Sequence, residues 1–174
     1  PVRDMLEDRL SLPVFVDNDS NAAALAEHRL GAGRGFRDMI YVAVASGVGG
    51  GLILGGDLYR GIHGCAGEIG HTTVVTGGKP CACGNYGCLE TVVSAQSMVE
   101  RAQCLWRTGM YPQARQYGET LTLDTVFALS DQGDPICRQV LEESANYLGI
   151  ALRNVNRRIQ FYFGIQYGVD VAST

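Results

Sequence analysis

The sequence predicts a mixed α/β fold in which strands come first and helices later. Short apolar runs bounded by polar residues or glycines recur in the first half, whereas longer runs with helical spacing fill the second half. The 174 residues are 46% apolar and 18% charged, which excludes a disordered chain and allows a core of one domain, or one and a part. The 23 glycines are about twice the usual share of ~7% and indicate tight turns or backbone pressed against a ligand.

The first predicted strand and helix adjoin. The apolar run 13–16 predicts a buried strand, and the polar residues 17–19 follow at its carboxyl end. An Ala-rich helix is expected over 21–30, with Asp19 or Ser20 as its N-cap and a glycine after its last residue. The polar residues therefore sit at a strand-to-helix junction.

Two further strands are predicted around a glycine-rich loop. They cover 39–45 and 50–54, and the Gly-Gly pair at 55–56 predicts a hairpin turn into a short strand at 57–59. A further strand is expected at 71–75.

The second half of the chain is predicted to be helical. Helices are expected over 94–106 and 122–130, separated by a polar loop at 107–120. A longer helix is expected over 134–155, because an N-capping Asp followed by Pro begins a run with helical spacing.

Charge and hydropathy exclude two classes of partner for this segment. The net charge of −4 and the pI near 5.3 argue against a nucleic-acid surface, so DNA contact is expected only through a segment outside this chain. We find neither a run long enough to span a membrane nor a signal peptide, and three clustered thiols suit a reducing compartment. We therefore expect a cytoplasmic protein with no membrane contact.

Three of the six cysteines lie within eight residues. Cys81, Cys83 and Cys88 form a C-x-C-x4-C pattern, and His71 lies ten residues before the first of them. Three thiolates and one imidazole make a closed tetrahedral zinc site, which is structural rather than catalytic. The alternative is three unrelated cysteines in a surface loop. Two of the other cysteines lie in predicted helices and are expected to be small buried residues.

The glycine-rich loop joins two predicted strands. Ser46, Gly47, Gly49 and Gly50 lie in the run Ser-Gly-Val-Gly-Gly-Gly, whose backbone N–H groups can converge on an anion such as a phosphate. The run is neither a Walker A loop nor a dinucleotide fingerprint, since no Gly-Lys-Ser/Thr and no helix follows. A tight glycine hairpin without a ligand is an equal alternative.

Polar residues at scattered positions form a candidate binding set, namely Asn18, Asp19, Glu68, His71 and Glu90. Acidic groups, an amide and an imidazole in one cleft suit a polyhydroxylated ligand, and Asp19 beside a hydroxyl can act as general base for attack on a phosphoryl group. The alternatives are helix capping for Asp19 and simple solvent exposure for the two glutamates.

Four motifs in this order resemble the ROK family, whose name joins repressors and sugar kinases. They are NDSNAAALAE at 18–27, SGVGGG at 46–51, AGEIGH at 66–71 and CACGNYGCLE at 81–90. The last two are highly specific together, and the resemblance covers roughly residues 1–155.

The resemblance implies an actin-like, ribonuclease H-type α/β fold with two lobes around a cleft. Residues 1–30 then correspond to a remnant of the small lobe, and 31–174 to the large lobe with a zinc knuckle at 71–88. It also implies zinc on His71 and the three clustered cysteines, and sugar contacts from Asn18, Asp19, Glu68, His71 and Glu90. In the family's kinases the residue matching Asp19 is the catalytic base, and the glycine loop lies near the phosphates of ATP, used with Mg²⁺.

The chain departs from the kinases in three places. Their N-terminal phosphate loop, an Asp with Gly-Gly-Thr, has no counterpart, and Ser46 stands where they usually have Thr. Residues 156–174 do not resemble the expected next strand and its adenosine loop, although an irregular strand at 161–164 is an alternative to an altered terminus. We therefore expect this chain not to hold ATP on its own.

Two functions follow from the resemblance. Residues 58–61, 89–91 and 121–150 are more like the family's repressors, so we favour the effector-sensing part of a sugar-responsive repressor. The alternative is a piece of an ATP-dependent sugar kinase, and a scaffold role is a distant third. The family implies a hexose or N-acetylhexosamine ligand, with xylose an option for a repressor, and a homodimer or larger assembly.

Overall fold

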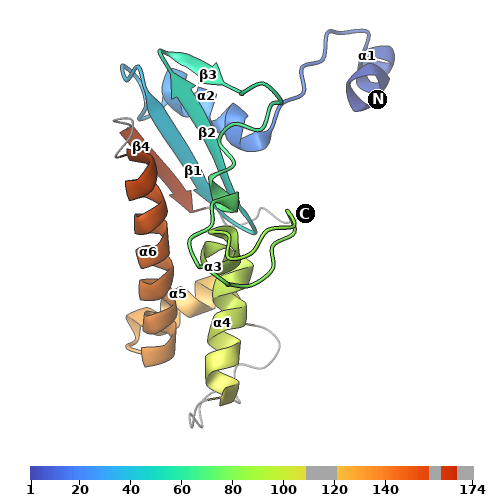
Figure 1. The fold of residues 1–174 in the computed structure, drawn as a ribbon. Helices are drawn as coiled ribbons and strands as arrows, with labels where there is room; N and C mark the ends of the chain where they lie inside the picture. The colour runs from blue at the N-terminus through green and yellow to red at the C-terminus, as the bar shows by residue number, and fades with distance from the viewer. Residues whose placement is uncertain (109–120, 157–161, 168–174) are drawn as a thin grey trace.

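A four-stranded sheet organises the computed structural model, which describes residues 1–108, 121–156 and 162–167 (Figure 1). The strands are β1 (Met39–Val44), β2 (Val48–Leu54), β3 (Asp57–Tyr59) and β4 (Tyr162–Tyr167), in the spatial order β3-β2-β1-β4. β1 and β2 are antiparallel, as are β2 and β3, whereas β4 runs parallel to β1. The sheet is therefore mixed parallel and antiparallel, and with its helices it makes the predicted α/β fold.

The predicted hairpin turn at 55–56 is confirmed, and the strand before it begins earlier than predicted. Gly55 and Gly56 both have positive φ, at 64° and 97°, and they make the turn into β3. β2 begins at Val48 rather than at Gly50, because the glycines pair with β1 through Gly49 and Gly50. Four of the six residues of the glycine-rich run 46–51 are therefore strand.

Two predicted strands are wrong. Residues 13–16 form no strand, and Phe15 in this run is 94% exposed. An apolar run becomes a strand only beside a partner strand, and the described residues supply none here. At 71–75 the 3₁₀ helix η1 (Ile69–His71) takes the first residue, and Thr73 makes only an isolated bridge to Cys88. Near the end of the chain the irregular-strand alternative holds, since β4 lies beside β1.

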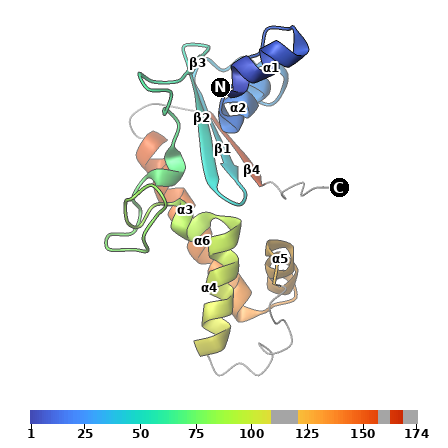
Figure 2. The ribbon, with the colours of Figure 1, turned by 90° about the vertical axis from the view of Figure 1, so that its right-hand side faces the viewer.

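One face of the sheet is covered by α2 (Asp19–Leu30) (Figure 2). Asn18, rather than the predicted Asp19 or Ser20, is the N-cap, because its Oδ1 accepts hydrogen bonds from the backbone N–H groups of Ser20 and Asn21. Gly31 follows the last residue as expected. Ala24 packs here against Met39, Tyr41 and Ile53 in a small core.

The other face borders the larger core, which the helices of the second half complete. α4 (Ala95–Thr108), α5 (Leu123–Asp131) and α6 (Pro135–Asn156) are close to the predicted ranges, whereas the short α3 (Glu90–Val93) was not predicted. Met98, Ala102 and Trp106 recur at helical spacing on α4 and are buried against this core. Most of the loop predicted at 107–120 lies outside the described residues.

Of the two cysteines in predicted helices, Cys137 is buried as expected and Cys104 is exposed, because it lies on the outer side of α4. The N-terminal helix α1 (Val2–Leu10) was not predicted, buries none of its residues and stands apart from the sheet (Figures 1 and 2). Within the described part of the chain, no helix is both long and apolar enough to cross a membrane.

Candidate functional site

The His71 imidazole and three thiols meet in one cluster. Their ligand atoms all lie within 4.8 Å of one another, with 3.5 Å between Cys81 Sγ and His71 Nδ1 and 3.7 Å between Cys83 Sγ and Cys88 Sγ. Two zinc–sulfur bonds of about 2.3 Å at the tetrahedral angle place their sulfurs about 3.8 Å apart. The donor set and its spacing therefore fit a zinc ion.

Glycine turns fold the chain around this cluster. Gly84 and Gly87 have φ of 89° and 67°, and the Cys81 N–H donates to the Asn85 carbonyl at 2.8 Å. Burial raises the pKa of the Cys88 thiol to about 12, whereas a backbone hydrogen bond at Asn85 lowers the pKa of Cys83. The cluster thus pairs one buried thiol with one exposed thiol.

The two ring nitrogens of His71 face different groups. Nδ1 lies beside Cys81 Sγ, and Nε2 is 3.6 Å from the Glu68 carboxylate. Glu68 directly precedes η1, so a single turn of backbone carries both side chains. The imidazole therefore connects the thiol cluster with an acidic group from the predicted binding set.

Glu90 contacts the backbone of the glycine-rich turn before β2. It is the first residue of α3, is half-buried, and its Oε2 accepts a hydrogen bond of 2.9 Å from the Val48 N–H. A β-carbon at Gly47 would lie only 2.7 Å from the same oxygen. Simple solvent exposure is therefore the wrong interpretation of Glu90.

Close packing explains several glycines of β2. A β-carbon at Gly49 would overlap Ser20 Oγ, and one at Gly50 would lie 2.5 Å from the Gly67 carbonyl oxygen. Helix α2 and the segment before η1 thus approach β2 from its two sides, and only glycine permits this. Gly49 and Gly50 are accounted for without a phosphate, whereas Ser46 and Gly47 belong to the turn.

Asn18 and Asp19 lie exposed at the start of α2. The Asn18 Oδ1 is occupied by the helix cap, which leaves its Nδ2 group as the donor for a ligand. Asp19 Oδ1 accepts a hydrogen bond of 2.7 Å from the Ser20 N–H. Because Asn18 caps the helix, Asp19 is not required for that role.

The predicted polar residues are carried by elements that meet along the first half of β2. Glu90 contacts Val48, Ser20 beside Asp19 adjoins Gly49, and the backbone just before Glu68 adjoins Gly50. This part of β2, residues 48–51, is therefore the centre of the candidate site. Sequence reasoning missed a neighbouring ion pair between Asp17 and Arg60, because 43 positions separate its members and nothing local connects them.

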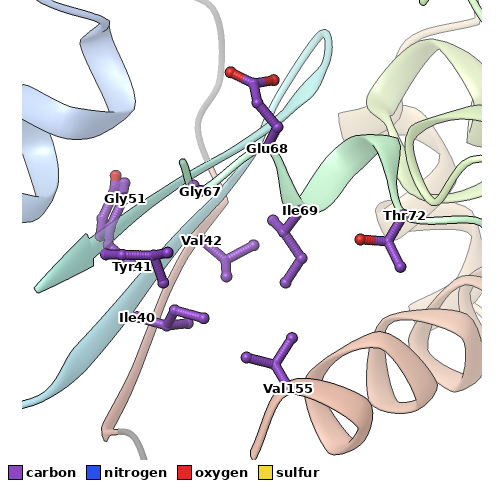
Figure 3. Close-up of a pocket in the computed structure, with 11 residues that line it drawn as sticks. Ile40, Tyr41, Val42, Gly51, Gly67, Glu68, Ile69, Thr72 and Val155 are labelled. Carbon is purple, nitrogen blue, oxygen red and sulfur yellow. The ribbon is translucent and has the colours of Figure 1, made fainter. Parts of the chain in front are cut away.

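A cavity of about 230 Å³ lies behind this centre, between the sheet, η1 and the end of α6 (Figure 3). Its walls are mostly aliphatic, with Ile40, Val42, Ile69 and Val155 directed inward, whereas the Glu68 carboxylate points away (Figure 3). Aliphatic walls cannot hydrogen-bond to hydroxyls, so a polyhydroxylated ligand does not belong there.

Comparisons with known proteins agree with the motifs. Glucokinase of Halalkalibacterium halodurans is 42% identical over 159 residues, which make up 89% of this chain and 48% of that protein. The xylose repressor of Caldicellulosiruptor bescii is 33% identical over 157 residues, 89% of this chain and 39% of that protein. The chain thus spans less than half the length of these two relatives.

A solved structure shares the fold. The ROK family glucokinase from Streptomyces griseus in complex with glucose and AMPPNP superimposes with a TM-score of 0.86 and 34% identity, over 97% of this chain and 56% of that one. The family model described as "ROK family" matches residues 1–161. This match covers most of the chain, and the chain therefore belongs to the ROK family.

Proposed function

We propose that this chain is the sugar-binding, effector-sensing portion of a ROK-family transcriptional repressor of carbohydrate metabolism. The observation that carries the proposal is that Glu90 contacts β2 at Val48, that the elements bearing Asn18, Asp19 and Glu68 adjoin residues 49–51, and that His71 lies beside Glu68. The similarity to a xylose repressor along 89% of the chain supports the regulatory role. DNA binding belongs to a segment outside this chain, as its acidic charge favours.

The polar groups suit a hexose or N-acetylhexosamine. Each hydroxyl of the ligand donates to a carboxylate oxygen of Asp19, Glu68 or Glu90, and the Asn18 amide donates to a ring or hydroxyl oxygen. Hydrogen bonds to ionised groups contribute about 1.5–3 kcal/mol each, so a few of them suffice for selective binding.

We further propose structural zinc on His71, Cys81, Cys83 and Cys88, a knuckle within 71–88 of the large lobe. Zinc there supplies a fixed tetrahedral anchor. His71 is then held with one ring nitrogen on the metal and the other beside Glu68, at the edge of the sugar site. The four donors and their distances support this assignment.

The same proposal extends to the whole protein. Residues 1–30 belong to a small lobe of an actin-like fold and 31–174 to its large lobe. The exposed apolar side chains of Val2, Met5, Leu12 and Phe15 support further contacts of the first segment, within the protein or in a dimer.

A second candidate is a sugar kinase, favoured by the 42% identity to a glucokinase and by the presence of Asp19. In that reaction the Asp19 carboxylate accepts the proton of a sugar hydroxyl, and the oxygen of that hydroxyl attacks the γ-phosphorus of ATP held with Mg²⁺. The bond from that phosphorus to the β-γ bridging oxygen breaks, and ADP leaves. The turn at Ser46 and Gly47 would face the phosphates.

Calorimetric titration tests the sugar site. We expect one sugar from a panel of glucose, N-acetylglucosamine, N-acetylmannosamine and xylose to bind, and Glu90→Gln to weaken it at least tenfold, since a charged hydrogen bond is lost. The control is Glu142→Gln, an exposed glutamate on α6. No binding by any sugar, or equal loss in both variants, contradicts the proposal. An ATP-dependent phosphorylation assay and a DNA-binding assay on the full-length protein then separate repressor from kinase.

A further inference from the structure

An ion pair joins the hairpin to the segment before α2. Arg60 follows β3 directly, and its Nε and Nη2 donate to Asp17 Oδ2 at 3.0 and 2.6 Å. Two donors of one guanidinium on one oxygen fix its direction more tightly than a lysine ammonium does. The hydrogen bond at Arg60 lowers the pKa of Asp17 below its ordinary value.

The second oxygen of Asp17 turns toward the helix start. Its Oδ1 accepts a hydrogen bond of 2.9 Å from the Asn18 N–H and one of 3.1 Å from Asn21 Nδ2. Asn21 is only 2% exposed, and its own N–H donates to the capping oxygen of Asn18. Asp17 therefore ties Arg60 on one side to the residues around Asn18 on the other.

The segment leading to Asn18 has few other ties. Residues 11–18 contain no helix or strand, and the Val14 N–H donates to Glu7 on α1, which itself stands apart from the sheet. The Arg60 pair links this segment to the hairpin formed by β2 and β3. The Arg60 pair thus adds a second constraint on the residue before Asn18, beside the helix cap that Asn18 itself makes.

Exposure separates this positioning role from a role in stability. The side chains of Arg60 and Asp17 are 52% and 30% exposed, and ion pairs at such sites contribute only about 0–1 kcal/mol to folding. A contact that adds little stability but sets the geometry of two binding residues affects ligand affinity more than folding.

We propose that Arg60, through Asp17, is a positioning residue that holds Asn18 and Asp19 in the orientation needed to bind the sugar. This inference rests on the proposed function for the identity of the ligand. It does not require a repressor or a kinase, since both bind the sugar at the same residues.

The test compares Arg60→Ala, Arg60→Lys and the matched control Arg34→Ala, an exposed arginine before β1. We expect Arg60→Ala to raise the Kd for the sugar that the wild-type chain binds by about tenfold, the equivalent of ~1.4 kcal/mol. Its midpoint of urea unfolding stays near the wild-type value, Arg60→Lys recovers part of the affinity, and the control binds normally. Unchanged affinity in Arg60→Ala, or equal losses of affinity and stability, overturns the proposal.

An arm without ligand distinguishes this inference from the proposed function. In ¹H–¹⁵N spectra of the sugar-free protein, Arg60→Ala should shift the backbone amides of Asn18, Ser20 and Asn21, and Arg34→Ala should not. If no sugar binds the wild-type chain, the proposed function fails, and these amides alone show whether Arg60 sets the start of α2. Unmoved amides then refute the positioning role.

Discussion

Replacing Gly51 with Ala measures how tightly α2 is packed on β2. A β-carbon at Gly51 would lie 2.5 Å from Ala24 Cβ and 2.8 Å from the Ser20 carbonyl oxygen. Both distances are far below the 3.5–4.0 Å of an ordinary contact, and neither neighbour is a flexible side chain that can turn away. The helix must therefore shift, and overpacking of this kind costs about 1–3 kcal/mol.

A second glycine provides the opposite control. Gly149 lies exposed in α6 with nothing within 4 Å of a β-carbon placed there, so Gly149→Ala adds helix propensity without a clash. We expect a gain of about 0.5–1 kcal/mol. Urea unfolding followed by circular dichroism gives both values, and Gly51→Ala combined with Ala24→Gly should recover part of the loss. A Gly51→Ala variant as stable as the wild type would refute the close approach of α2.

Three further predictions concern the site. Protein purified without chelator should contain about one zinc per chain, as metal analysis will measure. Cys83→Ser should reduce both the zinc content and the sugar affinity measured by titration, since His71 serves both sites in the proposal. Full sugar affinity without zinc would count against a shared histidine. In the full-length protein, Asp19→Asn should abolish any ATP-dependent phosphorylation while leaving the sugar Kd within about tenfold, and an active variant would exclude Asp19 as the base. The pKa of Asp17 is lowered in the fold, so its pair with Arg60 contributes its full stabilisation above the unfolded pKa of about 3.9 and loses it as pH falls through the folded pKa. The small difference in unfolding free energy between wild type and Arg60→Ala should therefore vanish at low pH. A difference that grows with acidification would contradict this.

The structural features that the sequence predicts correctly are those that depend on residues close to one another in the sequence. The turn at 55–56 and the spacing on α4 and α6 are local patterns, and the structure confirms them. The run at 13–16 has the composition of a strand, but a strand also needs a partner, and composition says nothing about that. The start of β2 differs from the prediction for the opposite reason. Its glycines have the composition of a loop, yet they pair with β1 and leave room for α2 and for the segment before η1.

The candidate site shows the same difference between contacts of residues close in sequence and contacts of residues far apart in sequence. The predicted zinc ligands lie close in sequence at a recognisable spacing, and the structure brings the four donor groups together. Asp17 and Arg60 are ordinary charged residues in loops, and only the three-dimensional path of the hairpin brings them together. The hydrogen bond from Val48 to Glu90 has the same origin, because it joins residues 42 positions apart.

The short strand β3 has a consequence for aggregation. It forms one edge of the described sheet, is only three residues long, begins with the charged residue Asp57 and is followed by Arg60. A foreign strand gains few hydrogen bonds on so short an edge, and charges there oppose docking. Edge-to-edge pairing with the sheet of a second molecule is therefore disfavoured along this side.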